Sequence, residues 1–349
     1  MGMRRGILLV ILLALLAIPV QALDIQPPEA PDRVSELMPR EADSFTEGVW
    51  HLVKAALARA EGPWKEAVGI CLGAVCAVLL CSLVGEVSPE TAGKAGNLAC
   101  CCAVATLLLR RSDALLTLGL ETAGELREYG ALLLPVMTGA MAAQGGVTKS
   151  AALYSGTVLF NQILSTVLTR LMKPLLLLFL GASMANRVLA DGFLEKLRGF
   201  LKWLMGWLLK GVLYAFSGLL AITGAVSGTA DAAAVRAAKV TISTAVPVVG
   251  GILSEASELV LVSAGTLGSA AGVYGMLTVL ALFSGPFLRI GIQYALLKGV
   301  SAFCSGFSPG GGAGLLEDFS TAMGLILAMV SAQTVMLLVS TLCFMKGVV

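Results

Sequence analysis

The stretch FSTAMGLILAMVSAQTVMLLVSTLCFM, residues 319–345, contains no charged side chain. An α-helix rises about 1.5 Å per residue, so a run of this length can cross the roughly 30 Å hydrocarbon core of a bilayer. Because that core offers no water to bond the peptide groups, a spanning segment of this kind must be helical. The run therefore predicts a transmembrane helix and an all-α fold.

Similar uncharged runs recur along the whole chain. Of the 349 residues, 57% are hydrophobic and only 13% are charged, whereas soluble domains carry roughly 25% charged residues. We therefore expect a polytopic transmembrane helical bundle with about seven to nine membrane segments, solvated by membrane lipid. The longer runs cover residues 67–85, 129–148, 150–169, 211–230, 259–288 and 319–345, and shorter candidates cover 95–109, 174–190 and 240–254.

The amino terminus has the order of regions found in a secretory signal. Arg4 and Arg5 precede an apolar run over residues 7–18, and the small-residue site Val20-Gln21-Ala22 follows. This order predicts a signal peptide over residues 1–22 that is removed after Ala22. A retained first anchor is the alternative, and in either case the region that follows should begin on the extracytoplasmic side of the membrane.

Residues 23–66 form the one sizeable polar region, which we expect to be an extracytoplasmic linker and an amphipathic helix. A Pro-rich start is typical of extended linkers. Ser44, followed by Glu47 three residues later, is a capping-box signature, and apolar residues then recur at helical spacing. The helix would lie on the outer membrane face, dock a partner, or cover the protein's own bundle as a short lid.

The next region, residues 67–128, is expected to be an N-terminal transmembrane hairpin followed by a loop over the charged stretch 110–128. Positive charges fall on both sides of strictly alternating spans, so the positive-inside rule gives no complete topology. The stretch 187–202, which carries Arg187, Lys196, Arg198 and Lys202, is the best candidate for a cytoplasmic loop.

Two stretches of the chain resemble each other and indicate an internal repeat. Pro135-Val-x-x-Gly139 matches Pro247-Val-x-x-Gly251, which divides the chain into transmembrane repeat 1 over residues 129–230 and repeat 2 over 240–349. Corresponding Pro/Gly interruptions in two halves point to a transport path. The alternative is that these residues only kink spanning helices for packing.

The second copy carries carboxylates close to apolar segments. Glu255 and Glu258 lie on adjoining parts of one helical face, and membrane carboxylates usually face a cavity, a partner or water. The segment would line an aqueous path or a subunit contact, or its glutamates would point into solvent at the interface. The candidate pore or subunit-contact set is Pro135, Gly139, Pro247, Gly250, Gly251, Ser254, Glu255 and Glu258.

Amide side chains in the apolar runs are expected to hydrogen-bond between helices. They are Asn161, Gln162, Asn186, Gln293 and Gln333.

The sequence offers no basis for an enzyme, a cofactor, a metal site or a nucleic-acid surface. The net charge is +2, and the single histidine, His51, lies far in sequence from the eight cysteines. Those cysteines lie almost entirely in apolar runs, where Cys behaves as a small hydrophobe. Residues 145–150 lack the glycine that a phosphate-binding loop places before its lysine. We therefore expect no catalytic residues and no cofactor.

The segment TAVPVVGGILSEASE, residues 244–258, resembles the stage III sporulation protein AE family, and the resemblance extends through residues 274–303. It implies a component of a secretion-like channel complex in the mother-cell membrane around the forespore, supporting late forespore sigma factor G activity. The implied partners are the other stage III A sporulation proteins and, indirectly, stage II sporulation protein Q. The alternatives are a stand-alone secondary transporter or a non-conducting membrane scaffold.

Overall fold

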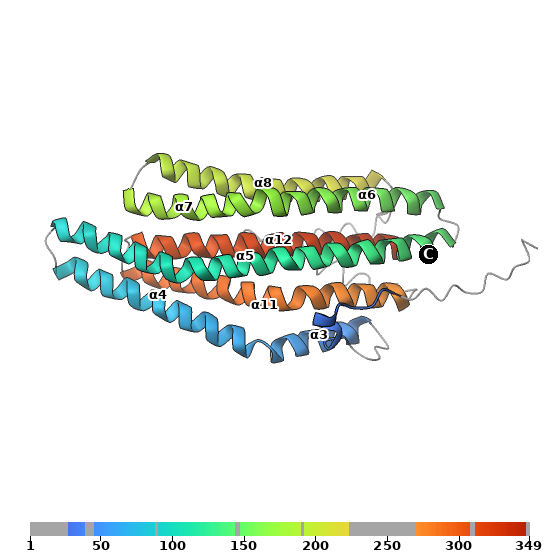
Figure 1. The fold of residues 1–349 in the computed structure, drawn as a ribbon, viewed down its shortest axis with the longest axis horizontal. Helices are drawn as coiled ribbons and strands as arrows, with labels where there is room; N and C mark the ends of the chain where they lie inside the picture. The colour runs from blue at the N-terminus through green and yellow to red at the C-terminus, as the bar shows by residue number, and fades with distance from the viewer. Residues whose placement is uncertain are drawn as a thin grey trace, which may run out of the picture.

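The computed structural model describes most of the chain as long helices that lie side by side along one axis (Figure 1). The predicted signal peptide and the segment 223–269, with six of the candidate residues, lie outside the described residues. The described ranges are 27–38, 45–87, 90–143, 147–189, 192–222, 270–307 and 311–346. Within them every regular element is helical, which confirms the predicted all-α fold.

The described helices have the following bounds, in chain order. They are α2 (Asp32–Ser35), α3 (Phe45–Ala58), α4 (Glu61–Val87), α5 (Glu90–Ala143), α6 (Val147–Thr166), the π-helical segment η1 (Val167–Met172), α7 (Lys173–Leu189), α8 (Gly192–Ile222), α11 (Ala270–Phe307) and α12 (Gly311–Lys346). In Figure 1, α6, α7 and α8 form one side of the bundle, α4 and α3 form the other, and α5, α11 and α12 lie between them.

Helix α12, which contains the stretch 319–345, is the central helix. It packs against α5, α11, α6, α7 and α8, and the most apolar window of its span is entirely buried inside the protein. A helix that is apolar on every side needs apolar surroundings on every side. Here protein supplies those surroundings.

Five helical stretches in the described part of the chain are long and apolar enough to cross a membrane. They are Glu61–Leu80, Ser150–Arg187, Gly192–Leu220, Gly272–Gly306 and Gly312–Met345. This confirms the polytopic character expected from the sequence, while the number of seven to nine segments stays a prediction.

The expectation of a loop over residues 110–128 was wrong, because this stretch is the middle of the 54-residue helix α5. Leu115, Leu116 and Leu126 are buried at helical spacing, so one face of the charged stretch belongs to the core. Two of its charges form ion pairs with other helices, Arg111 with Glu66 and Glu125 with Arg33. Charge alone therefore did not mark a loop.

The runs 150–169 and 174–190, expected to be separate segments, form one continuous helical stretch through α6, η1 and α7. Pro174 has no N–H and would clash with the carbonyl group one turn earlier in a regular helix. The π-helical segment lies directly before it, and such wider turns accommodate interruptions in the hydrogen-bond ladder.

The stretch 187–202 is also mainly helical rather than a loop. Helix α7 ends at Leu189 and α8 begins at Gly192. Leu201, Met205 and Leu209 are buried at four-residue spacing. This spacing lets α8 pack against the bundle from Leu201 onward, while Lys196 and Lys202 are exposed.

Helix α3 confirms the predicted amphipathic helix and lies over the protein's own bundle. Its buried residues are Phe45, Gly48 and Leu52, and the helix packs on α11. A Cβ atom at Gly48 would lie 2.6 Å from Leu277, so this close approach depends on glycine. The opposite face exposes Trp50 and Leu57, which leaves an apolar surface for lipid or a partner.

Two glycines of α5 provide a matched test of the packing around α12. A Cβ atom at Gly130 would lie 2.9 Å from Leu337 of α12, whereas nothing lies within 4 Å of one at Gly139. Because overpacking a close contact costs about 1–3 kcal/mol, we expect Gly130→Leu to lower the unfolding temperature in detergent and Gly139→Leu to leave it nearly unchanged. Equal effects of the two changes would contradict the packing of α5 on α12.

Candidate functional site

Of the candidate pore residues, the structure describes Pro135 and Gly139. Both lie on an exposed face of α5, and the helix continues through Pro135. They therefore do not break a helix in the described bundle, and their role as a subunit contact or path stays a prediction. The other members, Pro247, Gly250, Gly251, Ser254, Glu255 and Glu258, lie outside the described residues.

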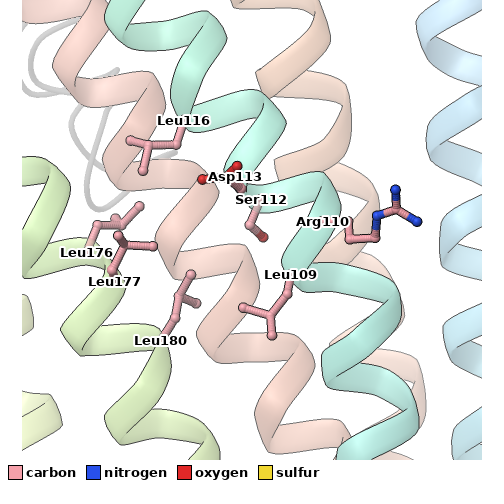
Figure 2. A pocket seen from close by; sticks show the side chains of 8 residues that line it. All are labelled: Leu109, Arg110, Ser112, Asp113, Leu116, Leu176, Leu177 and Leu180. Atoms are coloured by element: carbon pink, nitrogen blue, oxygen red, sulfur yellow. The ribbon is translucent and has the colours of Figure 1, made fainter.

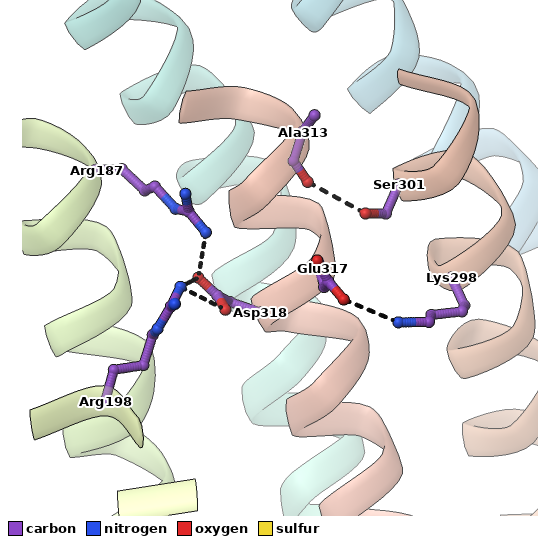
Figure 3. A network of polar contacts seen from close by, with 7 residues as sticks. All are labelled: Arg187, Arg198, Lys298, Ser301, Ala313, Glu317 and Asp318. Atoms are coloured by element: carbon purple, nitrogen blue, oxygen red, sulfur yellow. Dashed lines mark hydrogen bonds and ion pairs between the residues drawn. The ribbon is translucent and has the colours of Figure 1, made fainter. Parts of the chain in front are cut away.

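A cluster of ionised side chains surrounds the start of α12 (Figure 3). At this end of the bundle α7 and α11 end and α8 begins. Asp318 is the centre of the cluster. Nη1 of Arg198 donates to both oxygens of this carboxylate, at 3.0 and 2.9 Å, and Nη2 of Arg187 donates at 3.3 Å. The side chain of Asp318 is only 9% exposed, so the two guanidinium groups supply the compensation that its charge requires.

The opposite side of α12 is held by α11. Lys298 donates to Glu317 at 3.0 Å, and Ser301 donates to the backbone carbonyl of Ala313 at 3.2 Å. Lys298 and Glu317 are about half exposed, so their ion pair contributes little stability. The cluster thus ties the first turns of α12 to α7 and α8 through a buried carboxylate, and to α11 through weaker contacts.

A second polar contact lies deep in the bundle. Nε2 of Gln333 in α12 donates to Oδ1 of Asn161 in α6, and both side chains are buried. This confirms the prediction that these two amides hydrogen-bond between helices. Such a bond contributes about 1 kcal/mol, and it favours the register in which Gln333 of α12 faces Asn161 of α6.

The face between α5 and α7 is hollowed by a pocket of about 280 Å³ (Figure 2). Its walls are mainly leucines of the two helices, with Ser112 and Asp113 as polar members, while the side chain of Arg110 extends toward the other side of α5. The mainly apolar lining suits an acyl chain or a partner's apolar side chain.

Sequence reasoning identified Arg187 and Arg198 as cations but did not select Asp318, Glu317 or Lys298. A signal for the acidic pair was present. Glu317 and Asp318 are the last charged residues before the stretch 319–345, which is where a spanning helix meets its boundary. The pairing of Asp318 with two arginines more than 100 positions away required the fold.

The two acidic neighbours on α12 give a second matched test. Removing one member of a buried ion pair costs about 3–5 kcal/mol, whereas an exposed pair contributes about 0–1 kcal/mol. We expect Asp318→Asn to lower the free energy of unfolding by about 3 kcal/mol and Glu317→Gln to change it by less than about 1 kcal/mol, as measured by denaturation in mixed micelles. A larger loss for Glu317→Gln would contradict the assignment of Asp318 as the anchor.

The family model of stage III sporulation protein AE matches residues 34–346, nearly the whole chain. The comparisons with curated proteins and with solved structures found no match. The matched range contains every described helix from α3 to α12, including the central helix and the ionic cluster at its start. The chain is therefore a member of the stage III sporulation protein AE family, a sporulation protein whose apolar helices associate with membrane.

Proposed function

We propose that this protein is an integral membrane component of a sporulation-specific export or feeding channel complex in the mother-cell membrane. In this role it supports late forespore sigma factor G activity. The observation that carries the proposal is the family match over nearly the whole chain, combined with five apolar spans in the described helices. A protein of this composition acts inside a bilayer rather than in water.

The surface of the bundle supports a role as one subunit among several. The apolar windows of three outer spans, in α4, α6–α7 and α8, are only 22%, 33% and 28% buried within the chain. Their exposed leucines and tryptophans require lipid or another protein as cover. We propose that the cover includes the other stage III A sporulation proteins, which link this chain indirectly to stage II sporulation protein Q.

The position of α12 favours a subunit over a stand-alone transporter. Within the described residues, the axis of the bundle is filled by this buried helix. A transport path lined by these helices would therefore run between this chain and neighbouring subunits of the complex. A secondary transporter instead binds its substrate near the middle of its own bundle, at broken helices, and Pro135 lies in a continuous one.

The arrangement of the ends also fits the proposed sidedness. Helix α3 lies toward one end of the bundle, and the end of α7 and the start of α8 lie at the other (Figure 1). An extracytoplasmic amino-terminal region and a cytoplasmic 187–202 stretch are therefore compatible in one orientation. In a cysteine-free background, Thr46→Cys should react with an impermeant maleimide from outside and Glu195→Cys from inside. Labelling of both from the same side would contradict this orientation.

Reconstitution separates the proposed function from its alternatives. We expect the purified chain alone to give no substrate flux across liposomes, and its deletion in the sporulating host to abolish a sigma factor G reporter. We also expect it to co-purify with the other stage III A proteins from sporulating cells. Autonomous flux would support a secondary transporter instead. A normal reporter after deletion would contradict the proposed role.

A further inference from the structure

A polar hollow of about 440 Å³ lies over the first turns of α12, between α7 and α11. Arg187 reaches it from one side and Lys298 from the other, as Figure 3 shows. Ser301, Ser305 and Gly314 complete much of the wall. Unlike the leucine-lined pocket between α5 and α7, this hollow is lined by two cations and by Glu317. The hydroxyl groups of Ser301 and Ser305 donate to the backbone carbonyls of Ala313 and Ala302.

The side chains around the hollow carry more positive than negative charge. Arg187, Arg198 and Lys298 form the ion pairs described above, and Lys202 also acts electrostatically on Glu317. The charged residues that line the hollow itself are the cations Arg187 and Lys298 and the carboxylate Glu317, and Asp318 pairs with Arg187 and Arg198. An anion in the hollow would therefore meet a positive local field.

One donor at this place is left without a partner. Nε of Arg187 is buried and makes no hydrogen bond within the described residues. The guanidinium group lies so close to the backbone of α12 that a Cβ atom at Gly314 would collide with it. Because Gly314 has no side chain, the guanidinium group of Arg187 can lie against the backbone of α12 at the edge of the hollow. Only one of its nitrogens donates to Asp318.

The hollow also lies where apolar helical stretches end and charged side chains begin. It is next to the ends of three candidate spans, at Arg187, Gly306 and Gly312. Basic pockets between transmembrane helices at such boundaries bind acidic headgroups. Arginine and lysine with nearby hydroxyl groups are also the usual donors to phosphate.

From these observations we propose that the hollow between α7, α11 and α12 is a binding site for a phosphate group. The phosphodiester of an anionic phospholipid and a free phosphate share this chemistry. The lipid form would connect the start of the central helix to the membrane surface. The site involves residues other than the pore candidates, so it can be tested whether or not the channel role holds.

The test uses the full chain, purified in a neutral detergent and stripped of lipid. Its unfolding temperature and native mass spectrum are measured with phosphatidylglycerol, with phosphatidylcholine and with inorganic phosphate. We expect phosphatidylglycerol to raise the unfolding temperature and to stay bound, and phosphatidylcholine to do neither. An equal effect of inorganic phosphate would assign the site to free phosphate. If neither phosphatidylglycerol nor phosphate differs from phosphatidylcholine, the proposal is overturned.

Single substitutions test whether phosphatidylglycerol binds in this hollow. Removing one cation near a membrane surface costs about 1 kcal/mol, so Lys298→Gln should weaken phosphatidylglycerol binding about fivefold. Ser305→Glu should weaken it further, because it places a negative charge in the hollow while leaving the ion pairs intact. Lys196→Gln is the matched control, since this exposed lysine lies in the same region of the bundle but does not line the hollow. An equal loss with Lys196→Gln would contradict the assigned site.

Discussion

The burial of α12 by the rest of the chain is the constraint on which the bundle depends. A helix without a polar face cannot lie at a water boundary, so α5, α11 and the α6–α8 layer must all be long enough to cover it. Helix α12 has 36 residues, and α5, with 54, extends beyond it. At about 1.5 Å per residue, α5 extends for about 80 Å, well beyond a hydrocarbon core of about 30 Å, and its charged middle pairs with α2 and α4.

Polar contacts give this apolar packing its register. Leucine and alanine surfaces pack with little preference for one register over the next, whereas an amide pair or an ion pair is satisfied in only one. The Gln333–Asn161 bond aligns α12 with α6, and Asp318 aligns it with both Arg187 and Arg198. Arg187, Lys298 and Glu317 of the same cluster also line the proposed phosphate site, so the anchor of the central helix and the proposed site lie side by side.

The sequence predicted the helical class, the membrane environment and the family, because long uncharged runs and the segment 244–258 carry those signals directly. It could not show which apolar helix faces lipid and which faces protein, since both environments select the same side chains. For that reason 319–345 looked like an ordinary spanning helix. It also placed a loop at 110–128, where charged residues lie on one face of a helix whose other face is buried. A second loop was placed at 187–202, most of which belongs to the end of α7 and the first turns of α8.

The most direct test of the account is labelling of the native membrane-embedded protein with a lipid-soluble diazirine, mapped by mass spectrometry. Exposed side chains of α6 such as Leu159 and Ile163 should be labelled strongly. Residues 319–345 should be labelled weakly on every face, since protein rather than lipid surrounds them. Labelling of α12 as strong as that of α6 would show that the central helix contacts lipid, and would contradict the arrangement from which the rest is derived.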